Sequence, residues 1–145
     1  MRPPDRILVA LDESGAAWRA LNFALRRAAR GRHEVTVLAV LDSRIATLAV
    51  RTGPGQMGAA ASITDRLEGL FERARAVARI EGVAIATQMT ASTDPAGEIV
   101  NVARAGSYDE VVVGHREKRG LERMVIGSTA LRVLEELTVP VTIVH

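Results

Sequence analysis

Residues 111–129 read VVVGHREKRGLERMVIGST. Val111–Val113 predict the end of a buried strand, and Gly127–Thr129 stand where a new helical pattern begins. A glycine lets backbone N–H groups approach an anion closely because no Cβ intervenes. A helix N-terminus adds unpaired N–H donors and the positive end of the helix dipole. This strand, basic loop and helix start predict a phosphate site, although Glu117 places a carboxylate in the middle of the loop.

The same alternation of strand and helix runs along the whole chain. Apolar runs at 7–11, 35–41, 83–89, 110–113 and 139–144 are separated by segments with helical spacing of apolar residues. Apolar strands in strict alternation with helices favour a parallel sheet with helices on both faces. We therefore expect one α/β domain, residues 1–145, with a five-stranded parallel sheet in the order 3-2-1-4-5. The Arg44–Gly58 segment, with three glycines and Pro54, is expected to be a long mobile loop.

The composition excludes several classes of function. Cysteine is absent, which excludes disulfides, thiolate zinc sites and a cysteine nucleophile. No apolar run approaches the roughly 20 residues that a membrane span needs. Arginine is spread over the helical segments and alternates with glutamate, and only 3% of residues are aromatic, a pattern that does not favour nucleic-acid binding. We expect a cytoplasmic protein with no membrane and no nucleic-acid partner.

In a sheet of this kind, ligands bind beyond the carboxyl ends of the strands, at the point where the strand order reverses. Asp12, Asp42, Gly114 and Gly127 stand just beyond such ends. Simpler roles stay open for each residue type: a helix cap for Asp12, turn glycines for Gly114 and Gly127, a helix cap for Ser128, and a solvated surface for the basic loop.

Enzyme chemistry has little support in the sequence. There is no G-x-S-x-G pattern, no Ser-His-Asp set and no G-x-G-x-x-G after the first strand. The three histidines are too dispersed to predict a metal site, and His115 is expected at the surface. We therefore expect no catalytic or metal-binding residues.

Four segments resemble the universal stress protein family, and the resemblance covers nearly the whole chain. These are ILVALDES at 7–14, TDPAGEIV at 93–100, YDEVVVG at 108–114 and VPVTIV at 139–144. The family's ATP-binding branch has a glycine, two residues, a second glycine, nine residues, and then glycine with serine or threonine. Gly114 and Gly127-Ser128 match the outer positions, whereas Glu117 replaces the second glycine.

The resemblance implies a Rossmann-like fold of the adenine-nucleotide alpha hydrolase type and a set of nucleotide contacts. Asp12 would lie near the adenine or ribose, and the backbone of Val40 would contact the adenine. Gly127, Ser128 and Thr129 would hold phosphate. The remaining implied contacts are Ala10, Val113, Gly114 and Arg116.

Two functions follow as expectations. The first is a regulatory module of the stress response that binds ATP, with Mg²⁺, and has at most a slow, incidental ATPase activity. A carboxylate about 4 Å from a phosphate charge costs about 4 kcal/mol at an effective dielectric near 20, unless Glu117 turns to solvent, pairs with an arginine or helps to bind Mg²⁺. The second is an interaction module without nucleotide. The resemblance implies a homodimer through the C-terminal strand, Val139–Val144, whose edge is expected to be exposed.

Overall fold

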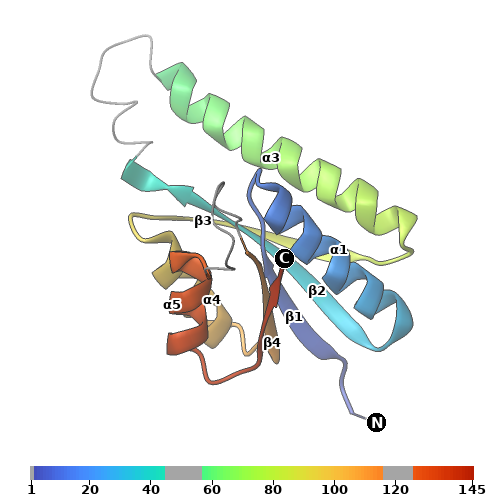
Figure 1. The fold of residues 1–145 in the computed structure, drawn as a ribbon. Helices are drawn as coiled ribbons and strands as arrows, with labels where there is room; N and C mark the ends of the chain where they lie inside the picture. Colours follow the sequence, from blue (N-terminus) through green and yellow to red (C-terminus); the bar gives the residue numbers. More distant parts are fainter. Residues whose placement is uncertain (1, 45–56, 116–125) are drawn as a thin grey trace.

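The computed structural model describes residues 2–44, 57–115 and 126–145 (Figure 1). Strands and helices alternate along the chain, as the sequence predicts. Their bounds are β1 Asp5–Ala10, α1 Gly15–Arg30, β2 His33–Asp42, α3 Met57–Ile80, β3 Ile85–Ser92, α4 Pro95–Ala105, β4 Glu110–Gly114, α5 Ser128–Glu136 and β5 Val141–Val144.

The five described strands form one parallel sheet in the order β3-β2-β1-β4-β5. The predicted order is therefore confirmed. Strands β1, β2 and β3 lie side by side in sequence order, and β4 then pairs with the other side of β1. The reversal falls between β1 and β4, where Val9 lies beside Val112. The edge strands are β3 and β5.

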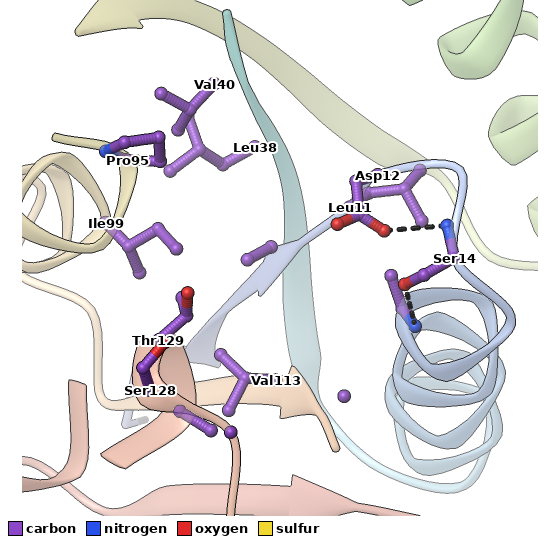
Figure 2. A pocket seen from close by; sticks show the side chains of 15 residues that line it. Leu11, Asp12, Ser14, Leu38, Val40, Pro95, Ile99, Val113, Ser128 and Thr129 are labelled. Atoms are coloured by element: carbon purple, nitrogen blue, oxygen red, sulfur yellow. Dashed lines mark hydrogen bonds between the residues drawn. The ribbon is translucent and has the colours of Figure 1, made fainter. Parts of the chain in front are cut away.

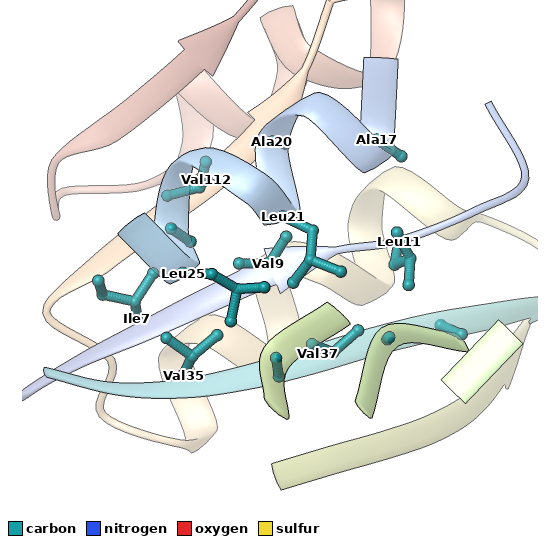
Figure 3. Close-up of a cluster of buried hydrophobic side chains, with 14 of the residues drawn as sticks. Ile7, Val9, Leu11, Ala17, Ala20, Leu21, Leu25, Val35, Val37 and Val112 are labelled. Atoms are coloured by element: carbon teal, nitrogen blue, oxygen red, sulfur yellow. The ribbon is translucent and has the colours of Figure 1, made fainter. Parts of the chain in front are cut away.

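Helices cover both faces of the sheet. On one face, α1 and α3 lie side by side (Figure 1) and pack on a cluster that includes Ile7, Val9 and Val37 (Figure 3). On the other face, α4 and α5 pack on Leu8, Leu38 and alternate residues of β4. Because side chains of a strand alternate between faces, β1 supplies both clusters from neighbouring residues.

The two edge strands are less buried than the central strands β1 and β4. Residues of β3 alternate between exposed and half-buried, and all four residues of β5 are half-buried. Strand β3 also begins two residues later than the apolar run at 83–89 predicts. Val83 still belongs to the turn that ends α3, because its N–H donates to the Ala78 carbonyl. An edge strand has only one neighbour, so its side chains pack less deeply.

A buried ionic cluster ties β5 to the rest of the sheet. Both carboxylate oxygens of Glu110 accept from Arg27 of α1, at 2.6 and 2.5 Å. The Thr142 hydroxyl of β5 donates to the same carboxylate at 2.5 Å. The Glu110 side chain is only 12% exposed, so these partners replace the water that a buried carboxylate loses.

Two segments lie partly or wholly outside the described residues. Of the Arg44–Gly58 segment predicted as a loop, residues 45–56 are not described, while Met57 and Gly58 belong to α3 rather than to a loop. Helix α3 thus begins inside the segment predicted as a loop. Residues 116–125, which contain Arg116 and Glu117, are also outside the described part of the chain.

Candidate functional site

A cavity of about 680 Å³ opens at the carboxyl ends of the central strands, where the strand order reverses. This volume is within the range of small-molecule sites. The wall comes from strands β1, β2 and β4 and from the starts of three helices (Figure 2). Its residues are Ala10, Leu11, Asp12, Ser14, Ala17, Leu38, Val40, Pro95, Ile99, Val113, Gly114, Gly127, Ser128, Thr129 and Ala130.

Eight of the nine residues predicted from the sequence line this cavity. They come from four separate stretches of the chain, and the fold brings them together: Ala10, Asp12, Val40, Val113, Gly114, Gly127, Ser128 and Thr129. The ninth, Arg116, lies outside the described residues, as does Glu117.

The wall divides into an apolar side and a polar side. Leu38, Val40, Pro95 and Ile99 lie together on one side, and Asp12 and Ser14 lie on the other (Figure 2). An apolar slot beside a few polar groups suits a ligand with a flat, weakly polar part and a polar part. Seven lining residues are not among those predicted from the sequence: Leu11, Ser14, Ala17, Leu38, Pro95, Ile99 and Ala130. The period-2 pairing of Leu38 with Val40 on β2 is the signal that marks Leu38 as a neighbour on the same face.

Asp12 does not cap α1, contrary to the simpler role considered for it. Its carboxylate accepts from the Ser14 N–H at 2.8 Å, and the Ser14 hydroxyl then caps the helix by accepting from the Ala17 N–H at 3.2 Å (Figure 2). Asp12 is exposed. It is thus held by the turn after β1 with its carboxylate at the cavity wall.

Three helix N-termini meet the cavity, and they are capped differently. Ser14 caps α1 with its hydroxyl, and Asp94 caps α4 by accepting from the Gly97 N–H at 3.3 Å. The N-cap of α5 is Gly127, which makes no side-chain cap bond. Ser128 is therefore the first residue of α5 rather than its cap, which corrects the simpler role. No side chain among the described residues caps the start of α5, so its N–H donors are available there to another acceptor.

Gly114 and Gly127 have different physical reasons to be glycine. A Cβ at Gly114 would lie 2.3 Å from the backbone carbon and oxygen of Ala16, so packing against the start of α1 requires glycine there. A Cβ at Gly127 would meet none of the described atoms within 4 Å, and its φ of −62° suits any residue. Within the described structure, only free space adjoins the Gly127 Cα.

The rim near α4 and α5 carries a chain of ion pairs. Asp94 Oδ1 accepts from Arg132 at 2.5 Å, Arg132 Nε donates to Glu136 at 2.8 Å, and Asp42 accepts from Arg44 at 2.7 Å. The hydrogen bond from Arg132 holds the pKa of Asp94 below its usual 3.8, and the bond from Arg44 does the same for the pKa of Asp42. These carboxylates remain charged, and Arg132, in the middle of α5, links that helix to the start of α4.

His115, expected at the surface, is buried with 3% exposure. Its N–H donates to the Val144 carbonyl at 2.7 Å, so it extends the β4–β5 ladder by one step. It is absent from the cavity wall. The part of the chain that the structure describes contains no cluster of three or more His, Asp or Glu residues that could hold a metal ion.

The fold and the cavity can now be compared with known proteins. The model of the universal stress protein family matches residues 4–145. The chain belongs to this family. A curated universal stress protein, YxiE of Bacillus subtilis (strain 168), is 32% identical over 147 residues, which cover 97% of this chain and 99% of that protein.

Solved structures of universal stress proteins share the fold. UspA of Lactobacillus plantarum superposes with a TM-score of 0.77 at 20% identity and full coverage of both chains. The Archaeoglobus fulgidus protein in complex with dAMP gives 0.72 at 22% identity, also over both whole chains. An Arabidopsis thaliana family member with AMP bound gives 0.71 at 19% identity, over 97% of this chain and 91% of that one.

Proposed function

We propose that this universal stress protein is a regulatory module that binds an adenine nucleotide in the cavity between β1 and β4. Residues 1–145 act as one universal stress protein domain, in the cytoplasm. The cavity has the volume of a small-molecule site and lies where such sheets bind ligands. The solved family members that carry dAMP and AMP support an adenine nucleotide as the ligand.

The two sides of the wall suit the two parts of a nucleotide. Adenine fits the apolar slot of Leu38, Val40 and Ile99, where the backbone of Val40 is within reach of its polar edge. The carboxylate of Asp12 suits ribose hydroxyls, because an ionised carboxylate only accepts hydrogen bonds. Ala10, Val113 and Gly114 form the floor between these sides.

The start of α5 carries the proposal. Among the described residues, it is the one of the three helix N-termini at the cavity without a side-chain cap, and none of their atoms lies within 4 Å of a Cβ at Gly127. Its N–H groups, the dipole of α5 and the hydroxyls of Ser128 and Thr129 offer donors to a phosphate. At the two neighbouring helix starts, the side chains of Ser14 and Asp94 each already take one of these donors.

ATP with Mg²⁺ is the form of the nucleotide that the family motif favours, and Arg116 is the remaining proposed contact of this ligand. The carboxylate of Glu117 would repel a nearby phosphate charge and so weaken the binding of a triphosphate. Titration calorimetry with ATP, ADP and AMP, each with and without Mg²⁺, tests the proposal. Glu117→Gly should tighten ATP binding. The absence of heat and of any thermal shift with all three nucleotides at millimolar concentration would overturn it.

The binding of nucleotide is proposed as regulatory rather than catalytic, with at most a slow and incidental ATPase. The described wall of the cavity holds a single ionisable side chain, Asp12, and that residue is already engaged with the turn after β1. A turnover of nucleotide well above the background rate would refute this part of the proposal.

A dimeric interaction module is the second candidate, favoured by the position of β5 at the sheet edge. Strand β5 offers a row of unshared backbone groups on its outer side, which suits pairing with β5 of a second copy. Pro140 precedes β5, so it removes no donor from the strand itself. Light scattering at micromolar concentration should give a dimer, and Ile143→Pro should give a folded monomer. A monomeric parent protein would exclude this pairing.

A further inference from the structure

Three exposed arginines of α1 stand in a row on the face of the helix that is turned away from the sheet. Arg19, Arg26 and Arg30, called here the α1 ridge, are seven and four residues apart. At 100° per residue they fall within about 40° of each other, and the rise of the helix separates them by about 10.5 Å and about 6 Å. The buried face of α1 lies opposite. In Figure 1, α1 lies on the outside of the sheet next to α3.

The α1 ridge lacks the ion pairs that other arginines of the described chain make. Arg27 binds Glu110, Arg66 binds Glu13 and Arg75 binds Glu72. No ion pair or hydrogen bond involves a guanidinium of the α1 ridge in the residues that the structure describes. The sequence of α1 contains no acidic residue at all. The alternation of arginine with glutamate expected for the helices is therefore wrong for α1.

Part of this arrangement works against the stability of α1, whereas Arg30 lies in the last turn, where the helix dipole favours a cation. Arg26 and Arg30 are like charges one turn apart, which repel each other on a helix surface. A guanidinium nitrogen of Arg19 comes within 3.4 Å of the Cβ position of Gly15, the first residue of α1. The dipole there favours anions, not cations. A row of charges that has no partner within the described part of the fold is characteristic of a binding surface.

We propose that the α1 ridge binds an acidic helical segment of a partner protein. Guanidinium groups bind carboxylates through paired hydrogen bonds. Glutamates at positions i, i+7 and i+11 of a facing helix that runs parallel to α1 would stand at the same spacings as the three arginines. Charge complementarity and this spacing together define the partner. The proposal does not depend on nucleotide binding.

Two other anionic surfaces fit the α1 ridge less well. A membrane-bound helix inserts apolar side chains beside its cations, whereas Leu21 and Leu25 of α1 are fully buried against the sheet. Nucleic-acid binding commonly uses six or more phosphate contacts with aromatic stacking. The described ridge offers three cations, and Trp18 next to Arg19 is covered by Arg73 at 5.4 Å.

The test uses the full chain and a fluorescein-labelled helical peptide of alanine and glutamine with glutamates at i, i+7 and i+11. A second peptide of the same composition carries them at i, i+5 and i+10, on three different faces. Fluorescence anisotropy at an ionic strength of about 0.1 M, where the Debye length is about 10 Å, should show binding of the first peptide in preference to the second. The triple variant Arg19→Gln, Arg26→Gln and Arg30→Gln should weaken it by about tenfold or more, as expected for the loss of three exposed ion pairs.

A matched triple variant, Arg2→Gln, Arg66→Gln and Arg75→Gln, removes the same charge from arginines that are already paired. It should change peptide affinity by less than about threefold, because net charge alone acts weakly through salt. Equal losses in the two triple variants, equal affinity for the two peptides, or no binding would overturn the proposal. Tighter binding to a DNA duplex or to phosphatidylglycerol vesicles would also overturn it. Thermal melts of both variants establish that each is folded.

Discussion

Replacing Gly127 by alanine should change nucleotide affinity strongly and the free energy of unfolding only slightly. A Cβ at this position meets none of the described atoms within 4 Å, and the backbone already has an ordinary φ of −62°. Alanine lowers the entropy of the unfolded chain, which stabilises by about 0.4–1 kcal/mol. It is a poorer N-cap than glycine by a similar amount. We therefore expect the free energy of unfolding to change by less than about 1 kcal/mol.

Nucleotide affinity should respond much more strongly to the same methyl group. If the phosphate lies against the first turn of α5, the new Cβ takes up space that a phosphate oxygen needs to reach the N–H donors. Loss of one hydrogen bond to a charged group costs about 1.5–3 kcal/mol. The Kd should then rise by about tenfold to a hundredfold.

Gly114→Ala provides the matched comparison, because it adds the same methyl group at the other end of the motif. Its Cβ would lie 2.3 Å from the Ala16 backbone, so α1 must move. Overpacking of this kind costs about 1–3 kcal/mol. Urea unfolding and calorimetry with AMP and ATP are measured for both variants. Parent-like affinity in Gly127→Ala would refute the placement of phosphate at α5, and a loss of stability as large as in Gly114→Ala would show that Gly127 is structural.

Two further predictions concern the ionic clusters. Glu110→Ala should lower the free energy of unfolding by about 1–3 kcal/mol, because it leaves Arg27 and the Thr142 hydroxyl without their buried acceptor; an unchanged urea midpoint would show that the cluster contributes nothing. Because Arg132 holds the pKa of Asp94 below 3.8 in the folded state, this carboxylate adds stability above its unfolded pKa that is lost as the pH falls through the folded pKa. Thermal melts should thus show a steeper loss of stability below about pH 4 in the parent than in Arg132→Gln, and parallel curves would contradict the assignment.

The sheet could be predicted from the sequence because its signals are local. Each central strand is a short apolar run, and each helix lies between two such runs, so alternation alone fixes the layers. The edges were less predictable. The run at 83–89 includes Val83, which closes the turn after α3, and omits Ser92, which ends β3. An edge strand packs less deeply and does not need to be apolar throughout. The sequence pattern therefore marks the first and last residues of such a strand only weakly.

The site could be predicted only in part because several of its features depend on distant contacts. Strand order places Asp12, Val40 and Gly127 at one cavity although they are far apart in sequence. The backbone of His115 extends the β4–β5 ladder through its bond to Val144, and no local pattern distinguishes this buried histidine from a surface one. The capping of α1 by Ser14 rather than Asp12 depends on the turn geometry, since both residue types are good caps.

The difference between the two matching glycines changes what the sequence motif means in this protein. Gly114 lies against the backbone of Ala16, so the fold requires glycine there whether or not a nucleotide binds. A family member that had lost its ligand would still keep this residue. Gly127 has no such contact among the described residues, and serine or asparagine would cap α5 better than glycine does. The glycine at 127 therefore argues for a ligand, while the glycine at 114 argues only for the fold. Only one of the two matching glycines, Gly127, therefore supports nucleotide binding against the unfavourable carboxylate of Glu117. The nucleotide affinity of the Gly127→Ala variant measures the effect of the glycine, and that of the Glu117→Gly variant measures the effect of the carboxylate.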